Sequence, residues 1–314
     1  MKKVTFAIVG TGIVGERIIN QLLQNTEATI VALFDENGKR LQEMADTYGL
    51  YAASSYDEVL SLQPDWVYIG TPPVSHATLS EQAIAQGLNV LCEKPLAHNV
   101  EDGFGMAMAA QNNSIQTAMH FPLLYSPAVR HMMKLVDEGA IGKILRVELQ
   151  AYFPHWPRVW QQNPWIASRE QGGFTREIFP HYFQLMYRMF GQLSITSHET
   201  VYPEDETLAE IGVLAIGKTA RDIPFLLNGI SGVGQQEELS YTVYGAEGVL
   251  KLRNWSELSS AQKDSPFEIL TSFDSVKSLT EECVLAVHGE EALLVSFDEG
   301  LEVQKLIDQL LDES

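Results

Sequence analysis

The sequence predicts an α/β protein of two domains, with a doubly wound parallel sheet in the first and a mostly antiparallel sheet in the second. Three observations support this prediction. The apolar run Val4–Val9 is followed by three closely spaced glycines and then by a segment with helical periodicity. Apolar runs and helical segments alternate from there to about His120. Later strand patterns follow one another with only short turns between them, which favours an antiparallel or mixed sheet.

The three glycines have the G-x-G-x-x-G spacing of a dinucleotide-binding turn. Gly10 permits the tight turn, and Gly12 leaves room for a pyrophosphate beside the backbone. Gly15 lets the helix Ile13–Gln24 pack against the strand, and the N-terminus of this helix attracts phosphates. Asp35 stands where an acid meets the adenosine ribose, which disfavours a plain strand–turn–helix without a ligand. The predicted cofactor contacts in this stretch are Gly10, Thr11, Gly12, Ile13, Val14 and Asp35.

Asp35 also predicts which cofactor binds. Its carboxylate would accept hydrogen bonds from the ribose hydroxyls and repel a 2′-phosphate, so we expect NAD over NADP. Lys39 and Arg40 lie close by in the sequence and leave NADP possible.

The other expected elements follow the same patterns. In the first domain, residues 1–120, they are the strands Thr29–Phe34, Trp66–Ile69, Asn89–Cys92 and Ile115–Met119 and the helices Asn37–Tyr48, His76–Gln86 and Glu101–Gln111. In the second, residues 121–314, they are the helices Pro127–Glu138 and Glu291–Leu311 and the strands Lys143–Phe153, Leu208–Ile216, Ile223–Ile230, Glu238–Tyr244 and Gly248–Leu252.

Composition narrows the possible partners. The formal net charge of −20 argues against nucleic acid or an anionic membrane as a partner. Two cysteines, Cys92 and Cys283, imply no disulfide framework and a reducing compartment. No stretch approaches the ~18 apolar residues of a membrane span, and the N-terminal apolar run is interrupted by glycines, unlike a signal peptide. We therefore expect a cytoplasmic protein, and no metal site is predicted.

Two short segments carry candidate catalytic residues. Lys94 follows a predicted strand in Glu93-Lys94-Pro95, and the proline restricts its backbone to extended geometry. Such a lysine can assist proton transfer, although a solvated loop lysine is an equal alternative. Glu177 and His181 share one face if the helix continues through Pro180, and the carboxylate could then orient the imidazole as a general base. A plain helix-surface pair is the alternative, and Pro180 could kink or start the helix.

The window Ala151–Phe190 has an unusual composition. It holds eleven of the 29 aromatic Phe, Trp and Tyr residues and carries about +2 fixed charges in a chain of −20. Aromatics together with arginines suit a ligand with a flat apolar face and oxygens or a carboxylate. The alternative is a second core, which we expect for Phe183, Tyr187 and Phe190. The candidate substrate residues are Trp156, Trp160, Trp165, Arg158, Arg169 and Arg176.

These segments together resemble the glucose–fructose oxidoreductase/inositol dehydrogenase family, known as Gfo/Idh/MocA. The matching segments are AIVGTGIVG, VALFDEN, DWVYIGTPPVSHATLSEQAIAQGLNVLCEKPLA, DEGAIGKI and the GG…E…H stretch. The resemblance implies a Rossmann domain followed by an α/β domain with an open sheet, one face of which commonly forms the oligomer contact. A homodimer or homotetramer is therefore expected.

The resemblance also implies roles for particular residues. Lys94 corresponds to the lysine near nicotinamide and substrate, and His181 to the proton-transfer histidine, with Glu177 where an aspartate is usual. Further cofactor contacts implied are Thr71, Pro72, His76, Glu93 and Lys94. Departures at the substrate pocket are Leu124, Phe179 and Gln184, where many members have arginine, glycine and aspartate.

The resulting hypothesis is an NAD(P)-dependent oxidoreductase. It would transfer a hydride between nicotinamide and a hydroxyl or carbonyl carbon of a small polar substrate, sugar-like or anionic. The alternatives are a dinucleotide-sensing regulatory protein without turnover and a reductase of C=N or C=C bonds.

Overall fold

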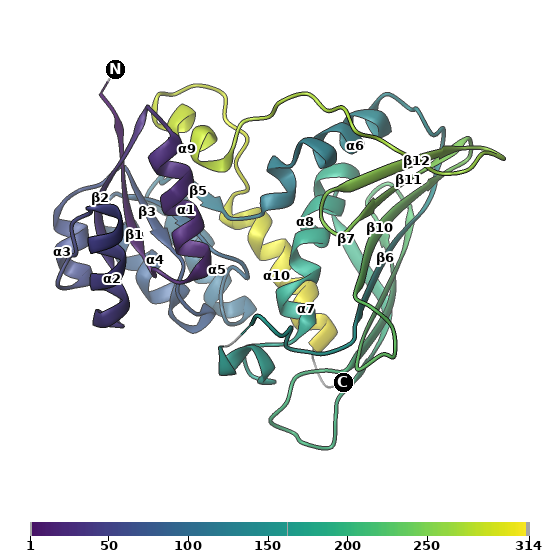
Figure 1. The fold of residues 1–314 in the computed structure, drawn as a ribbon, viewed down its shortest axis with the longest axis horizontal. Helices are drawn as coiled ribbons and strands as arrows, with labels where there is room; N and C mark the ends of the chain where they lie inside the picture. Colours follow the sequence, from purple (N-terminus) through teal and green to yellow (C-terminus); the bar gives the residue numbers. More distant parts are fainter. Residues whose placement is uncertain (1, 162, 312–314) are drawn as a thin grey trace. The chain divides into compact units, whose positions relative to one another are not determined.

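The computed structural model describes residues 2–161 and 163–311, and its N-terminal sheet has five parallel strands in the order β2-β1-β3-β4-β5 (Figure 1). The strands are β1 (Val4–Val9), β2 (Ala28–Phe34), β3 (Trp66–Ile69), β4 (Asn89–Cys92) and β5 (Thr117–Met119). All four residues of β3 are buried, as expected for a strand covered on both faces. The carboxyl ends of β1, β3, β4 and β5 therefore lie along one edge.

Helices cover both faces of this sheet. They are α1 (Ile13–Gln24), α2 (Gly38–Tyr48), α3 (Tyr56–Ser61), α4 (His76–Ala85), α5 (Val100–Asn112) and α9 (Leu279–Val287). In Figure 1, α1 and α9 lie in front of the strands, whereas α4 and α5 are drawn fainter behind them. The caps follow local sequence: Asn37 accepts a hydrogen bond from the Arg40 N–H at the start of α2, and Gly49 ends it at a positive φ of 65°.

The C-terminal sheet has eight strands in the order β13-β12-β11-β10-β6-β9-β8-β7. Only the β6–β9 pair is parallel among the pairings described, so the sheet is mostly antiparallel. The strands are β6 (Ile144–Phe153), β7 (Leu193–Val201), β8 (Gly212–Thr219), β9 (Pro224–Ser231), β10 (Glu238–Gly245), β11 (Gly248–Arg253), β12 (Glu257–Gln262) and β13 (Glu268–Ile269). Both predicted sheet types are thus confirmed.

One face of the C-terminal sheet is covered and the other is open. Helices α6 (Pro127–Asp137) and α8 (Phe179–Phe190) lie on the same side of it (Figure 1). Burial alternates along the strands: on β8, Val213 and Ala215 are buried, whereas Leu214 and Ile216 are half exposed, at 50% and 52%. Among the described residues, no helix lies on the side of this sheet opposite α6 and α8 (Figure 1).

The chain divides into two compact units, and the C-terminal segment takes part in both. The first unit comprises Met1–Phe121 with Lys277–Gln304, and the second comprises Pro122–Val276 with Lys305–Ser314. A single division after residue 120 would place residues 277–304 in the second domain. They lie instead with the first because β5 is an edge strand whose Met119 N–H donates to the Val295 carbonyl, 2.8 Å away.

Two expected elements differ from the observed ones by more than two residues at an end. The predicted helix Glu291–Leu311 is α10 (Phe297–Leu311) only; before it, Val295 accepts a hydrogen bond from the Met119 N–H of β5. The predicted strand Leu208–Ile216 begins later, as β8, because Leu208 forms an isolated bridge with Ser168 instead.

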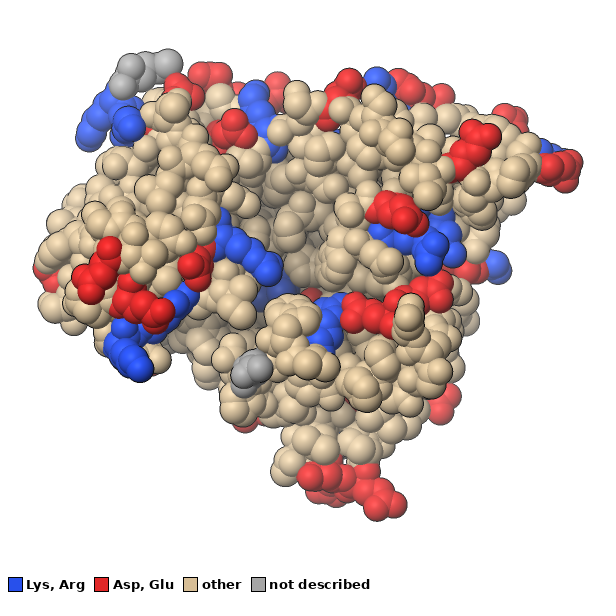
Figure 2. All heavy atoms as spheres, viewed as in Figure 1, with Lys and Arg blue, Asp and Glu red and all other residues tan. Residues whose placement is uncertain are grey.

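The described residues include no helix that combines the length and apolar character of a membrane span. Acidic residues outnumber basic ones by 41 to 21, and Figure 2 shows acidic side chains at many separate places on the visible face. The excess of negative charge is therefore distributed over the surface rather than gathered in one patch there.

Candidate functional site

The glycine turn after β1 leaves open space at one glycine only. Gly10 has φ +91°, and a Cβ added there would lie 2.5 Å from the Gly70 carbonyl oxygen. A Cβ on Gly15 would lie 2.1 Å from the Gly10 oxygen, so strand and helix pack too closely for any side chain. A Cβ on Gly12 would meet no atom within 4 Å. The two flanking glycines thus shape the turn, and the space beside Gly12 is free for a ligand.

The N-terminus of α1 can receive an anion. Gly12 is its N-cap residue and provides no side chain to accept hydrogen bonds from the first-turn N–H groups. Those groups and the positive end of the helix dipole suit a pyrophosphate. Glu16 in the first turn is held by Arg40, 2.7 Å away, whose hydrogen bond lowers the pKa of Glu16. The residues present therefore fit a dinucleotide.

Asp35 stands at the end of β2 beside the glycine turn. Its Oδ2 accepts hydrogen bonds from the Thr11 N–H and Thr11 hydroxyl at 2.7 and 2.8 Å, and its Oδ1 accepts one from the Asn37 N–H. Arg40 donates through Nε to the Thr11 carbonyl. The structure thus joins Asp35 to the glycine turn through Thr11, and it places the Arg40 guanidinium against the carbonyl of the same threonine.

His76 supports the loops rather than presenting a surface. It is fully buried, with Nε2 2.9 Å from the Thr71 carbonyl and Nδ1 3.0 Å from the Pro95 carbonyl. Burial lowers its pKa. Thr71 and Pro72 follow β3, and Pro95 follows β4, so His76 connects the two loops that the sequence assigned to the cofactor. A side chain without exposed surface acts by positioning these loops.

Glu93 and Lys94 follow β4 at the carboxyl edge of the sheet. Glu93 Oε1 accepts a hydrogen bond from the Tyr68 hydroxyl at 3.0 Å and lies 2.5 Å from His120 Nδ1. Burial alone would raise the pKa of Glu93, but the charge and hydrogen bond of His120, with Lys94 and Tyr68, hold it below the usual range. Lys94 is partly buried. Sequence reasoning did not find Tyr68 and His120 as partners of Glu93, although both belong to neighbouring strand ends.

The GG…E…H segment forms two helices rather than one. Helix α7 (Phe174–Glu177) ends before Ile178, and α8 begins at Phe179 with Pro180 in its first turn. Glu177 and His181 therefore stand on consecutive helices, and the continuous i, i+4 face that their spacing would give is absent. The proline starts the second helix because its ring has no N–H to donate in a helix interior.

A buried carboxylate fixes the start of this segment. Glu210 is 1% exposed and accepts a hydrogen bond from the Thr175 N–H at 2.7 Å. Gly173 has φ +96°, and a Cβ there would lie 2.2 Å from Glu210 Oε2. Burial raises the pKa of Glu210, against the opposing effects of Thr175 and Arg176. Gly173 is thus required by a close carboxylate, and Gly172 by the Ile166 carbonyl oxygen, which would lie 2.2 Å from a Cβ there. The sequence revealed neither contact.

His181 lies in an aromatic environment. It is 7% exposed, and its ring meets that of Trp255 edge to face at a centroid distance of 5.2 Å. Trp255 also contacts Tyr182, whose ring stacks on Tyr241. Trp255 has a positive φ of 74° in the turn between β11 and β12. Nothing in its local sequence indicated that it would approach the predicted histidine.

Several candidate substrate residues contact other protein groups. Arg158 binds Glu237 through two nitrogens and lies over the rings of Phe153 and Trp156. Arg176 donates to the carbonyls of Arg169 and Gly172. These contacts account for much of the arginine and aromatic content of the window as packing.

The remaining members of the substrate set differ in exposure. Trp156 donates from Nε1 to the Ile166 carbonyl, and Arg169 lies over the Tyr202 ring. Trp165 is partly buried, whereas Trp160 is 56% exposed. Trp160 thus offers more free surface than the other tryptophans of this window. No group of three metal-ligating side chains occurs in the described part of the chain.

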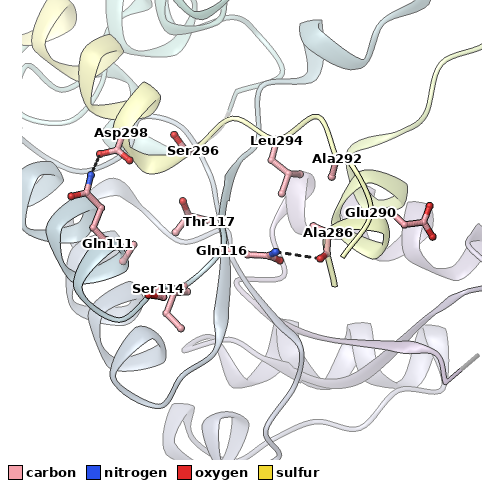
Figure 3. A pocket seen from close by; sticks show the side chains of 12 residues that line it. Gln111, Ser114, Gln116, Thr117, Ala286, Glu290, Ala292, Leu294, Ser296 and Asp298 are labelled. Atoms are coloured by element: carbon pink, nitrogen blue, oxygen red, sulfur yellow. Dashed lines mark hydrogen bonds between the residues drawn. The ribbon is translucent and has the colours of Figure 1, made fainter. Parts of the chain in front are cut away.

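A cavity of about 390 Å³ lies at the amino end of β5, away from the predicted site residues (Figure 3). Its lining includes Gln111, Gln116, Leu294 and Asp298, and Gln111 donates to Asp298. No predicted cofactor or catalytic residue lines it. It is therefore a feature of the opposite edge of the sheet from Glu93 and Lys94.

Comparison with known proteins decides the family. Residues 4–121 match the oxidoreductase family with NAD-binding Rossmann fold, and residues 129–251 match the C-terminal domain of the same Gfo/Idh/MocA family. The chain belongs to the Gfo/Idh/MocA family. The resemblance seen in the sequence is confirmed, and with it membership of an NAD-binding oxidoreductase family.

Relatives in the Gfo/Idh/MocA family match over most of the chain. An uncharacterized oxidoreductase of Synechocystis is 27% identical over 266 residues, 79% of this chain and 71% of the relative. Inositol 2-dehydrogenase of Rhizobium meliloti is 22% identical over 262 residues, 82% and 77% of the two chains. The structure of levoglucosan dehydrogenase in complex with NADH and L-sorbose has a TM-score of 0.84 at 18% identity, covering 99% and 96%. At that identity the structural likeness shows the fold alone.

Proposed function

We propose that this protein is an NAD(P)-dependent dehydrogenase that transfers a hydride between nicotinamide and a hydroxyl or carbonyl carbon. The observation that supports it most is the glycine turn, with free space at Gly12 and Asp35 bonded to Thr11. The bound cofactor would supply the hydride acceptor or donor. The protein would hold the pyrophosphate at the start of α1 and the adenosine ribose at Asp35.

We assign proton transfer to three residues. His181 would take the proton of the substrate hydroxyl as general base, Lys94 would assist, and Glu177 would orient the histidine. The partial burial of Lys94 and the near-complete burial of His181 support this because water is kept from most of each side chain. This assignment rests on the family pattern together with the E-K-P and GG…E…H segments.

The proposed substrate is a small polar compound, sugar-like or anionic. Relatives named inositol 2-dehydrogenase and levoglucosan dehydrogenase support a polyol or sugar. Trp160 offers an exposed ring of the kind that packs against the flat apolar face of a sugar. Arg158 contributes to such a site only if its bond to Glu237 opens, because that bond now uses two of its nitrogens.

The test is a cofactor titration followed by a thermal-shift screen of polyols, aldoses and sugar acids in the presence of NAD. Compounds that raise the melting temperature are then assayed for NADH formation at 340 nm, a wavelength specific to the reduced nicotinamide. Turnover of one of them supports the dehydrogenase. Stabilisation by several ligands without any turnover, in either direction, favours the dinucleotide-sensing alternative.

We also propose that the protein is a homo-oligomer joined through the open face of the C-terminal sheet. Three apolar side chains on this face are about half exposed: Leu214 at 50%, Ile216 at 52% and Ile230 at 41%. The strand register places Ile216 of β8 beside Leu226 of β9, so these apolar side chains form a continuous surface. Such a surface is costly to leave in water.

A further inference from the structure

The turn between β11 and β12 has an unusual backbone. The Ser256 N–H donates to the Arg253 carbonyl at 3.1 Å, so these four residues form a β-turn with Asn254 and Trp255 at its centre. Both central residues have a positive φ, of 46° and 74°. Turns with positive φ at both central positions are common in hairpins, and their usual second residue is glycine. Trp255 thus occupies a position that glycine would fill without strain.

A bulky side chain at positive φ is strained because its Cβ crowds the backbone carbonyl that follows. Such strain persists only where surrounding contacts hold the residue in place, and it occurs most often at functional sites. The Asn254 N–H donates to the Leu239 carbonyl at 2.9 Å, which ties this turn to β10. Trp255 is therefore held in a strained backbone conformation, which points to a role for its side chain.

The Trp255 ring contacts two rings of helix α8. Its centroid is 5.2 Å from that of His181, with the two ring planes at 82°, and 5.7 Å from that of Tyr182. Tyr182 stacks on Tyr241 of β10, and both tyrosines are fully buried. All four residues belong to the C-terminal unit. The two buried tyrosines thus hold the Trp255 ring, and Trp255 lies against the imidazole.

Helix α8 fixes the backbone of His181 but leaves the rotation of its ring open. The torsion that turns an imidazole has a broad range of allowed values, so a side-chain contact has to select one. A general base works only when its nitrogen is aimed at the proton that it takes. The edge-to-face contact with Trp255 supplies such a selection, because aromatic pairs of this kind have a preferred geometry.

We propose that Trp255 is a positioning residue that sets the orientation of the His181 ring for proton transfer. The inference rests on the proposed function, which assigns the general base to His181. Trp255 acts through the imidazole and takes no part in the chemistry itself. The strain in its backbone is maintained because glycine, the relaxed choice at this position, has no ring to place against the histidine.

Three variants separate the effect of the ring from that of the turn, in kinetics on a compound that the screen shows to be turned over. Trp255→Gly removes the ring and gives the turn its preferred residue, so the fold should be retained, as circular dichroism would check. It should lower kcat by about 10²-fold, the loss that a misplacement of about 1 Å causes, with KM and cofactor affinity unchanged. Trp255→Phe keeps an aromatic ring and should recover most of this loss. Asn254→Gly is the matched control: it relaxes the same turn, keeps Trp255 and should retain full kcat.

A double substitution tests whether Trp255 acts through His181. In a chain that already carries His181→Ala, Trp255→Gly should cause no further loss of kcat, because no imidazole is left to orient. Losses that multiply in the double variant would show an independent role and overturn the inference. A raised KM with unchanged kcat in Trp255→Gly would also overturn it, because the ring would then bind the substrate directly.

A second readout needs no substrate. Diethyl pyrocarbonate modifies accessible imidazole nitrogens, and mass spectrometry of the peptides distinguishes His181 from the other histidines. Since only 7% of His181 is exposed, it should react slowly in the unsubstituted protein and in Asn254→Gly. In Trp255→Gly it should react several times faster. Equal rates in all three proteins would show that Trp255 does not restrain the imidazole, which overturns the inference and leaves the proposed function standing.

The kinetic outcomes separate the two proposals. Full kcat in Trp255→Gly overturns the inference, and so does an equal loss in Asn254→Gly. In both cases turnover by the unsubstituted protein still supports the dehydrogenase. If the unsubstituted protein binds the cofactor but turns over no compound in either direction, both proposals are wrong.

Discussion

The two units hold their predicted site residues by different kinds of contact. In the N-terminal unit the site is shaped mainly by backbone atoms. Gly10 and Gly15 pack so closely against neighbouring carbonyl groups that no side chain would fit, and the Asp35 carboxylate accepts a hydrogen bond from a backbone N–H of the turn. In the C-terminal unit the segment from Gly173 to Thr175 is held by the side chain of Glu210, which comes from a distant part of the chain. A site shaped by backbone atoms can be predicted from local sequence, whereas a site held by distant side chains can be recognised only once the fold is known.

Each unit also buries one glutamate beside its predicted site, and the two carboxyl groups behave oppositely. Burial acts to raise the pKa of both. At Glu93 the charge of His120 outweighs burial and the pKa is lowered. At Glu210 burial outweighs the hydrogen bonds of Thr175 and the charge of Arg176, and the pKa is raised. What decides the direction is a cationic partner in direct contact, which only Glu93 has among the contacts described.

The largest expected effect tests the backbone-built turn. Gly12→Val should abolish cofactor binding because its branched side chain fills the space for the pyrophosphate, while the fold survives, since a Cβ there meets no protein atom. Gly15→Val is the matched contrast and should prevent folding, because its Cβ would lie 2.1 Å from a carbonyl oxygen. Calorimetric titration and thermal unfolding of both variants check this. If Gly12→Val binds the cofactor with the original affinity, the glycine turn is not part of the cofactor site.

The next effect concerns the C-terminal unit. His181→Ala should lower turnover by about 10²–10⁴-fold, the usual share of general acid–base catalysis, with cofactor affinity unchanged. Glu177→Gln should cause a smaller loss because it keeps the shape and removes only the charge. Lys94→Ala should reduce turnover and substrate affinity together. The measurement is steady-state kinetics on a substrate found in the screen; full activity of His181→Ala would contradict the assigned base.

The contrast between the buried glutamates predicts opposite pH effects on stability. Glu93 has a lowered pKa, so its contribution is full above about pH 4.3, the unfolded value, and is lost as pH falls through the folded value. Glu210 has a raised pKa, so its contribution is full below about pH 4.3 and is lost as pH rises through the folded value. The two residues therefore act in opposite directions on acidification.

Substitution of each glutamate measures this difference. At neutral pH, Glu93→Gln should destabilise by about 3 kcal/mol because it breaks a buried ion pair. Glu210→Gln should change stability by less than about 1 kcal/mol, since the amide oxygen can still accept from the Thr175 N–H. Denaturant unfolding at several pH values checks both. If the two variants lose equal amounts of unfolding free energy, the charged partner of Glu93 is not what distinguishes the two glutamates.

The two sheets predict a difference in association. The N-terminal sheet is covered on both faces, whereas the C-terminal sheet exposes Leu214 and Ile216. Ile216→Glu should convert the oligomer to a monomer in light scattering, with secondary structure unchanged. Lys218→Glu, on the same strand and face, is the control for a charge change without loss of an apolar contact. A monomeric unsubstituted protein would disprove the proposed interface.

The smallest effect concerns cofactor choice. We expect NAD to bind more tightly than NADP, because the Asp35 carboxylate repels a 2′-phosphate. Asp35→Asn keeps an oxygen that can accept from Thr11 and should narrow the difference by about tenfold. Arg40 lies beside the turn and would then face the phosphate. Tighter binding of NADP by the unsubstituted protein would reverse the assignment.

Much of the N-terminal fold could be predicted from the sequence. The bounds of β1, α1, β3 and β4 agree with the predicted ones, because apolar runs, helical periodicity and glycine turns are local signals. The polar strand β7 and the short strands at the other sheet edge, β12 and β13, had no comparable signal and were missed. Edge strands face water on one side and lack the apolar pattern of buried ones.

The sequence by itself determined the family, the glycine turn with its acid, and the two segments that carry Lys94 and His181. Only the tertiary structure decided that residues 277–304 close the edge at β5, that β6 pairs in parallel with β9, and that Glu93 meets His120. It also decided that Glu210, 35 residues beyond Thr175, binds the Thr175 N–H and lies against Gly173. The reason is physical: each of these contacts joins residues far apart in the chain, and their approach depends on which strands become neighbours when the core is buried.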